Sequence, residues 1–302
     1  MVLKSIFQLK ALTEIWTAND DLRKGNILRE TGLTGSLRWW YEALVRGLGG
    51  FACGAVDGGC GYEPGKKDES GREIPREKQI CPVCELFGCT GWSRKFRLRI
   101  LNSDGKPASV ECRAGREFYL EFLWLKKPGA EESWLLDRSL RIAAEYGSIG
   151  GKTTLKPQAK VSAVKDYGLF KVLSEPDVSS SLEEAKKFLG TYKASTTNDP
   201  EYPDLRNFFF LKGSFLDKDQ MNSFFEALPG TPLENKQDLT IKAFMKGKVG
   251  DSKKIFSFRS GGGRVWGYTR NDAELLIAMG ALKAELGIND IIIGERVMTG
   301  EL

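Results

Sequence analysis

Residues 94–101 read RKFRLRIL and residues 116–125 read REFYLEFLWL. In both stretches apolar and polar residues alternate, which is the period of a β-strand with one buried face. Each stretch is therefore expected to form a strand of a half-buried sheet. The inward-facing residues are expected to be Phe96, Leu98, Ile100, Phe118, Leu120, Phe122 and Trp124.

The segments on either side of these two strands are expected to form further strands and helices. An alternating strand is expected at 2–12 and a helix at 34–48, which the following pair of glycines ends. A second helix is expected at 131–146 and a further strand at 161–173. The order β-α-β-β-α-β is that of the ferredoxin-like split fold.

The second half of the chain repeats this order. The expected elements are a strand at 205–211, a helix at 217–228, strands at 239–249 and 254–259, a helix at 272–286 and a strand at 291–293. We therefore predict an α+β protein with two tandem ferredoxin-like (RRM-like, βαββαβ) domains. The first spans 1–173 and contains a Cys- and Gly-rich insertion at about 51–92. The second spans 174–302 and begins with a linker, in which Ser181 and Glu184 have capping-box spacing.

Composition narrows the function classes. The 302 residues include no histidine, which excludes every mechanism that uses histidine as nucleophile, general base or metal ligand. The net charge of +5 is compatible with a polyanionic partner. No apolar stretch approaches the roughly 18 residues of a membrane span, and the N-terminus lacks the apolar centre of a signal peptide. We expect a cytoplasmic protein with no membrane partner, whose six cysteines are thiols or metal ligands.

The run 30–40 (ETGLTGSLRWW) predicts a helix start suited to an anion. The first N–H groups of a helix have no intrahelical partners and lie at the positive end of its dipole. A capped helix with buried tryptophans is the alternative. The residues expected to contact RNA from this helix are Gly32, Gly35, Ser36, Arg38, Trp39 and Arg46.

The two tryptophans of this run differ in helical phase. Trp40 belongs to the apolar stripe of the helix and is expected in the core. Trp39 lies off the stripe, near basic residues. Two environments suit it equally: stacking on an unpaired base, or packing beneath the 51–92 insertion.

Two further segments combine glycines with basic residues. The segment 146–156 does not match a P-loop, because the GxxxxGK[ST] register is absent, so a phosphate-backbone contact is expected instead of nucleotide hydrolysis. The segment 259–270 interleaves arginines with aromatic residues, a pattern that suits nucleic acid. Ordinary connecting loops are the alternative for both segments. The expected RNA-contacting residues are Gly150, Gly151, Lys152, Thr153, Thr154, Lys156, Arg259, Arg264, Trp266, Tyr268 and Arg270.

The cysteines of the insertion predict a structural zinc site. Cys81 and Cys84 form a CxxC knuckle, and Cys53 and Cys60 lie upstream, so four thiolates are available for tetrahedral zinc. The first pair lacks CxxC spacing, and Cys89 competes as a ligand. Free or buried thiols are the alternative.

Together these segments resemble the RAMP superfamily of CRISPR-associated proteins, and they look like the family of first subunits in type III-B Cmr effector complexes. The resemblance is carried by 31–44 (TGLTGSLRWWYEAL), by 81–92 (CPVCELFGCTGW) and by the two glycine-rich loops. The first two segments are specific to that subunit, whereas the loops are generic to the superfamily.

The resemblance implies two ferredoxin-like domains and a role in antiviral defence within an RNA-guided complex. The implied partners are crRNA, target RNA and other Cmr subunits. Target cleavage belongs to a different subunit in that family, and the family pattern neither requires a cofactor nor secures the zinc.

We therefore predict a non-catalytic RNA-binding subunit. Two alternatives stay open: a His-independent endoribonuclease that processes CRISPR RNA with a Tyr or Lys as acid–base group, and a scaffolding subunit whose exposed aromatic residues bind proteins. If phosphate contacts dominate, the affinity for RNA should fall steeply with salt.

Overall fold

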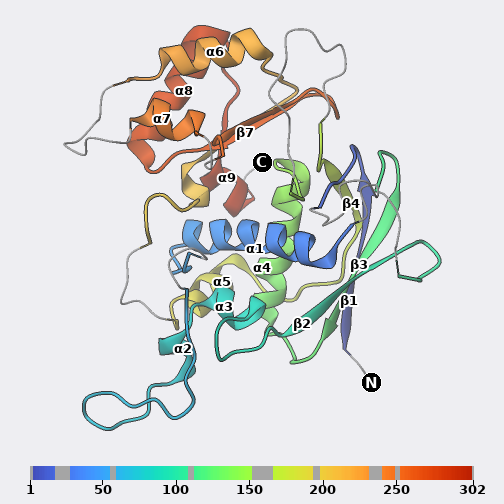
Figure 1. Ribbon diagram of the computed structural model, residues 1–302, viewed down its shortest axis with the longest axis vertical. Coiled ribbons are helices and arrows are strands. Elements are labelled where there is room, and N and C mark those ends of the chain that lie inside the picture. Colours follow the sequence, from blue (N-terminus) through green and yellow to red (C-terminus); the bar gives the residue numbers. More distant parts are fainter. Residues whose placement is uncertain are drawn as a thin grey trace.

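The protein contains two four-stranded antiparallel sheets, and helix α1 (Glu30–Gly47) contacts both of them (Figure 1). This computed structural model describes residues 3–17, 28–54, 59–107, 112–151, 166–192, 198–230, 240–248 and 252–300. Within these residues, no helix has both the length and the apolar character that are needed to cross a membrane.

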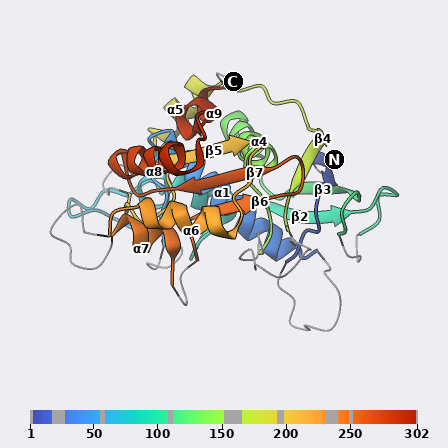
Figure 2. The same cartoon turned by 90° about the horizontal axis from the view of Figure 1, so that it is seen from above.

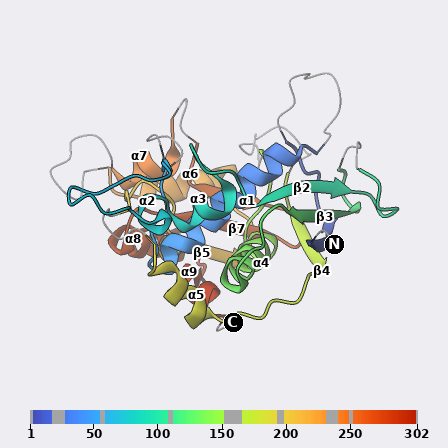
Figure 3. The same cartoon turned by 90° about the horizontal axis from the view of Figure 1, so that it is seen from below.

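The first sheet has the order β2-β3-β1-β4. Its elements are β1 (Lys4–Ala11), β2 (Phe96–Leu101), β3 (Glu117–Trp124) and β4 (Phe170–Ser174). Helices α1 and α4 (Ala130–Glu145) pack against this sheet, as the view from below shows (Figure 3). The succession β1-α1-β2-β3-α4-β4 with this strand order is the ferredoxin-like topology that the sequence predicts.

The alternation in β2 and β3 produces the predicted buried face. Leu98 pairs with Phe122 and Ile100 pairs with Leu120 across the antiparallel ladder. All seven residues that were expected to face inward are buried. The intervening residues of β2, Arg97 and Arg99, lie on the other side of the strand, because successive side chains point to opposite faces.

The second sheet repeats the topology with the order β6-β7-β5-β8. Its elements are β5 (Phe208–Lys212), β6 (Ile255–Phe258), β7 (Arg264–Tyr268) and β8 (Ile292–Ile293), with helices α6 (Lys218–Ala227) and α8 (Asp272–Leu286). Figure 2 shows α6 and α8 on the outer side of this sheet, next to the short helix α7 (Ile241–Lys246). The predicted pair of tandem ferredoxin-like folds is therefore confirmed.

Two elements of the second half differ from the prediction. The strand expected at 239–249 is wrong, because 241–246 forms α7, whose first turn is capped by Thr240 Oγ1 accepting from Ala243 N at 3.0 Å. The segment 264–268 was expected to be part of a loop but forms β7. Gly261, Gly262 and Gly263 have positive φ and form the turn between β6 and β7.

The missed strand β7 is buried on both faces. Trp266 and Tyr268 pair with Phe210 and Phe208. The ring of Trp266 contacts Trp40 of α1, and the ring of Tyr268 contacts Trp39. Val265 is also buried, on the opposite face of the strand. A strand that is buried on both sides shows no polar–apolar alternation, which is why its sequence pattern gave no strand signal.

Five shorter elements complete the described part of the chain, and one of them is the 3-10 helix η1 (Leu205–Asn207), which directly precedes β5. The insertion contains α2 (Arg76–Gln79) and α3 (Pro82–Phe87), and α9 (Gly294–Thr299) follows β8. Helix α5 (Leu182–Leu189) lies between the halves, and the predicted capping box of Ser181 and Glu184 is present. The domain boundary expected at residue 173 stays a prediction.

We expect Gly147→Ala to destabilise the fold. A Cβ on Gly147 would lie 2.1 Å from Cζ2 of Trp40, whose ring is buried and whose Nε1 donates to Ser148 O at 2.8 Å. Because this ring cannot move freely, the free energy of unfolding should fall by about 1–3 kcal/mol. Urea denaturation measures the change.

Gly280→Ala is the matched control for that substitution. Gly280 lies inside α8, and no atom lies within 4 Å of its added Cβ. Alanine there should raise the free energy of unfolding by about 0.5–1 kcal/mol. Equal urea midpoints for the two variants would contradict the packing assigned to Trp40.

Candidate nucleic-acid interface

A groove of about 440 Å³ lies where the first turns of α1 meet the loop after α4 and the second sheet. We call it the α1 groove. Its lining residues are Thr31, Gly32, Gly35, Ser36, Trp39, Trp40, Ser148, Gly150, Gly151, Ser252, Phe256, Trp266 and Tyr268. The groove therefore brings together residues from all three segments that the sequence singled out, although those segments are more than 100 residues apart in the chain.

Helix α1 begins one turn earlier than the sequence predicted. Its first residue is Glu30, and Leu33 N already donates to Arg29 O at 3.1 Å. Gly35 and Ser36 thus lie in the second turn, where N–H groups bond to carbonyls of the preceding turn. The expectation that their N–H groups bind an anion is wrong.

The groove wall near the helix start is held by a side-chain contact. Ser36 Oγ accepts a hydrogen bond from Gly150 N at 3.1 Å, which joins α1 to the glycine loop. Gly150 has a φ of 106°, and an added Cβ would lie 2.6 Å from Trp16 O. Only glycine fits this position without strain, because L-residues rarely adopt such a φ and the backbone of Trp16 is close.

Trp39 packs against the second sheet and not beneath the insertion. Its ring lies in edge-to-face contact with Phe208 and Tyr268, at centroid distances of 5.9 and 5.8 Å. The side chain is only partly buried and lines the α1 groove. Trp40 is 2% exposed, so the expectation that it belongs to the core is confirmed.

Arg46 and Arg264 bind backbone carbonyls of the protein itself. Arg46 is fully buried and donates to Ala52 O (3.1 Å), Pro203 O (3.0 Å) and Cys53 O (3.4 Å). Burial lowers its pKa. Because no part of the side chain reaches solvent, the expectation that Arg46 contacts RNA is wrong.

Arg264 caps the end of α4. Its Nη1 donates to Ala144 O at 2.9 Å and to Gly147 O at 2.6 Å, satisfying carbonyls that a helix end leaves without partners. Burial lowers the pKa of Arg264 to about 10, so the guanidinium remains charged at neutral pH. These contacts replace the phosphate contact that the sequence suggested.

The other predicted basic residues have different surroundings. Arg270 pairs with Glu274, and its guanidinium lies 5.1 Å from the ring centroid of Phe244. Arg259 is exposed and lies over the ring of Phe215 at 4.8 Å. Arg38 points toward the cysteines and pairs with Glu42 at 2.8 Å.

Four of the residues that were predicted to contact RNA lie outside the described residues: Lys152, Thr153, Thr154 and Lys156.

The described lining of the α1 groove contains no Asp, Glu, Lys or Arg. Its walls are aromatic rings, small hydroxyl side chains and glycine backbone. This chemistry suits a base and a ribose better than an isolated phosphate group, because every base offers a face that stacks on an aromatic ring.

Five residues of this groove were not predicted to contact RNA. They are Trp40, which was expected only in the core, and Thr31, Ser148, Ser252 and Phe256. Phe256 could have been found from the β6–β7 hairpin. This hairpin pairs Phe256 with Trp266 and brings their rings to a centroid distance of 4.2 Å. That hairpin was not recognised because β7 lacks alternation.

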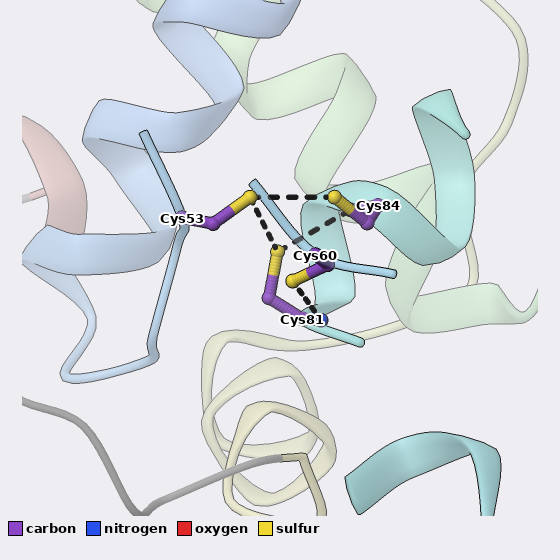
Figure 4. A group of neighbouring side chains, drawn as sticks. All are labelled: Cys53, Cys60, Cys81 and Cys84. Atoms are coloured by element: carbon purple, nitrogen blue, oxygen red, sulfur yellow. Dashed lines mark hydrogen bonds between the residues drawn. The ribbon is translucent and has the colours of Figure 1, made fainter. Parts of the chain in front are cut away.

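The four cysteines named for zinc come together. Cys53, Cys60, Cys81 and Cys84 are buried, and their Sγ atoms all lie within 4.8 Å of one another (Figure 4). The competing candidate, Cys89, is only partly buried and is not a member of this group.

Comparison with known proteins identifies the family. Residues 8–155 match the family model of the RAMP superfamily. The N-terminal half of the chain is a RAMP domain. The matched range contains the second half of β1, all of α1, the four clustered cysteines and both glycines of the loop after α4 that line the groove.

Two of the solved structures that are similar to this chain come from CRISPR systems. One is apo Cmr1 from Pyrococcus furiosus, at 12% identity over 89% of this chain and 88% of that chain, with a TM-score of 0.45. Another is a chain of the type III-B Cmr-beta complex bound to cognate target RNA and AMPPnP in the presence of ssDNA, at 11% identity over 94% and 99%, with a TM-score of 0.46. A search of curated proteins finds no match.

We expect Arg46→Met to destabilise this RAMP domain strongly. Methionine removes the donors for three buried carbonyls, and each unsatisfied buried group costs about 1–3 kcal/mol. The free energy of unfolding should fall by at least about 2 kcal/mol, measured by urea denaturation. Arg97→Met, which removes the same charge from the exposed side of β2, should change it by less than about 0.5 kcal/mol. A stable Arg46→Met variant would refute the structural role of Arg46.

Proposed function

We propose that this protein is a non-catalytic RNA-binding subunit of a type III-B CRISPR effector complex, where it binds crRNA and helps capture target RNA. The convergence of three separate segments on the α1 groove carries the proposal. RAMP membership supports it, and the assignment to a Cmr complex rests on the sequence resemblance of 31–44 and 81–92.

The dimensions and chemistry of the groove suit a nucleotide. Its volume of about 440 Å³ lies within the range of about 300–1,000 Å³ that small-molecule sites occupy. Trp39 supplies a partly exposed ring. Trp266 contributes a buried ring to the groove wall.

The chemistry of the groove supports binding without cleavage. The chain has no histidine, and the described groove lining has no charged side chain. General acid–base cleavage of RNA needs a group that exchanges a proton near neutral pH. A metal-free assay on repeat RNA tests this point: cleavage that one Tyr or Lys substitution abolishes would favour the endoribonuclease alternative.

Crosslinking tests the location of the RNA. Ultraviolet crosslinks between the full chain in its complex and labelled crRNA or target RNA should map to peptides from the groove, at 31–40, 148–151 and 252–268. Crosslinks concentrated elsewhere would overturn the proposed site. Intact complexes without crosslinks to this chain would favour a scaffolding subunit.

Gly35→Asp should weaken RNA binding without unfolding the protein. The added Cβ meets no atom within 4 Å, and the carboxylate would enter the groove and repel the RNA backbone. Displacing one stacked base should lower the affinity about 5- to 150-fold, since such a contact contributes about 1–3 kcal/mol. Fluorescence anisotropy with labelled single-stranded RNA measures the loss.

Gly280→Asp is the matched control, because it adds the same charge to another open helical position that lies outside the groove. Its affinity should stay within about twofold of the unaltered protein. Equal losses in both variants would show a general effect of charge and would count against the groove.

The salt dependence of the RNA affinity distinguishes base stacking from contacts to phosphate. Trp39→Ala should lower the affinity by a similar factor at low and high salt, because stacking releases no counterions. Arg259→Ala should instead reduce the slope of log affinity against log salt by about 0.7, the expected change for one lost contact to a single strand. Affinity that does not depend on salt in the unaltered protein would contradict polyanion binding.

A further inference from the structure

We propose that Cys53, Cys60, Cys81 and Cys84 bind one structural Zn²⁺ ion, and that Arg38 provides the outer-sphere countercharge of this site. The proposal stands on the insertion and does not depend on RNA binding.

The sulfur positions match a tetrahedral site. With Zn–S bonds of about 2.3 Å, the sulfur–sulfur edges of a tetrahedron measure about 3.8 Å. Cys53 Sγ lies 3.4 Å from Cys84 Sγ and 3.7 Å from Cys81 Sγ (Figure 4). All remaining Sγ pairs lie within 4.8 Å, so small side-chain adjustments suffice to place an ion at equal distance from the four atoms.

Two of the sulfur atoms accept hydrogen bonds from backbone N–H groups. Cys81 N donates to Cys60 Sγ at 3.3 Å, and Cys84 N donates to Cys81 Sγ at 3.4 Å. Such bonds stabilise thiolates, which are the form of cysteine that binds a metal. When zinc binds, each of the four thiols releases its proton to solvent as its Zn–S bond forms.

Arg38 balances the charge of the site. Four thiolates and one Zn²⁺ carry a net charge of −2. Arg38 Nη2 lies 3.7 Å from Cys84 Sγ and 4.0 Å from Cys53 Sγ, while its Nε pairs with Glu42 and its Nη1 donates to Gly88 O at 3.3 Å. This geometry places Arg38 next to the cysteines and explains why its side chain does not face the groove.

The position of the cluster explains why a metal is needed. Cys60 and Cys81 lie at the two ends of segment 61–80, of which 61–75 is almost entirely exposed and projects from the body (Figure 1). A segment that buries so little apolar surface cannot order itself through a core of its own. All four cysteines are buried, so the site offers no open coordination position and is structural, not catalytic.

Metal analysis of the full chain tests the site. The protein purified from zinc-supplemented medium should contain one zinc per chain by plasma mass spectrometry. Cobalt(II) substitution should produce the visible bands of a tetrahedral tetrathiolate. Cys84→Ser should lose the metal, whereas Cys89→Ser, the matched control from the same insertion, should retain it.

Two results would overturn the site. One is unaltered protein without metal whose four thiols react freely with a thiol reagent. The other is full zinc content in Cys84→Ser. Limited trypsin digestion gives an independent readout: chelation should speed cleavage after Lys66, Lys67 and Arg72 in the projecting segment, and unchanged cleavage would contradict the anchoring role.

The role of Arg38 has its own test. Arg38→Ala should weaken zinc affinity about 10- to 100-fold, the usual effect of removing an outer-sphere partner, and Arg38→Lys should restore part of it. Competition with a chromophoric chelator measures the affinity. Arg97→Ala, which removes an exposed charge elsewhere, should not change it, and an equal affinity in Arg38→Ala would refute the countercharge.

Discussion

The packing of Trp39 and Trp40 against the second sheet is the contact on which the arrangement of the two halves depends. The two indole rings meet edge to face at a centroid distance of 5.0 Å. Successive residues of an α-helix point about 100° apart, so the pair reaches two neighbouring environments from one turn. Trp40 enters the seam between α1, Gly147 and the second sheet, while Trp39 forms a wall of the α1 groove. One helix thus belongs to the first core and also forms part of the interface.

Buried guanidinium groups complete this interface. Arg46 joins the end of α1 to Pro203 in the second half, and Arg264 joins the β6–β7 hairpin to the end of α4. Arginine suits both positions because its five N–H donors can satisfy several carbonyls at once. Glycine-rich loops and helix ends present such carbonyls as readily as they present N–H groups. A basic residue among glycines is therefore ambiguous in a sequence, since it can serve a phosphate or the protein's own backbone.

The parts of the fold that were predicted are those in which local pattern and environment agree. The strand Phe96–Leu101 has one buried and one exposed face, so its alternation was visible. The strand Arg264–Tyr268 is buried on both faces and was missed. The helix was expected to begin at residue 34, where its apolar repeat was counted from, but α1 begins at Glu30. Gly32 therefore lies within the first turn, and its small size serves packing, since an added Cβ would lie 2.8 Å from Cβ of Thr17.

The sequence by itself determined the order of strands and helices, the absence of histidine chemistry and the presence of a CxxC knuckle, because each is a property of composition or of short-range spacing. Only the tertiary structure decided which cysteines meet, which arginines are occupied by the protein, and that Gly35, Gly150 and Trp266 line one groove. These residues are far apart in the chain, and their proximity follows from how two sheets pack against one helix. The periodicity of the sequence does not predict that packing, because it reports only on neighbours within one helix or strand.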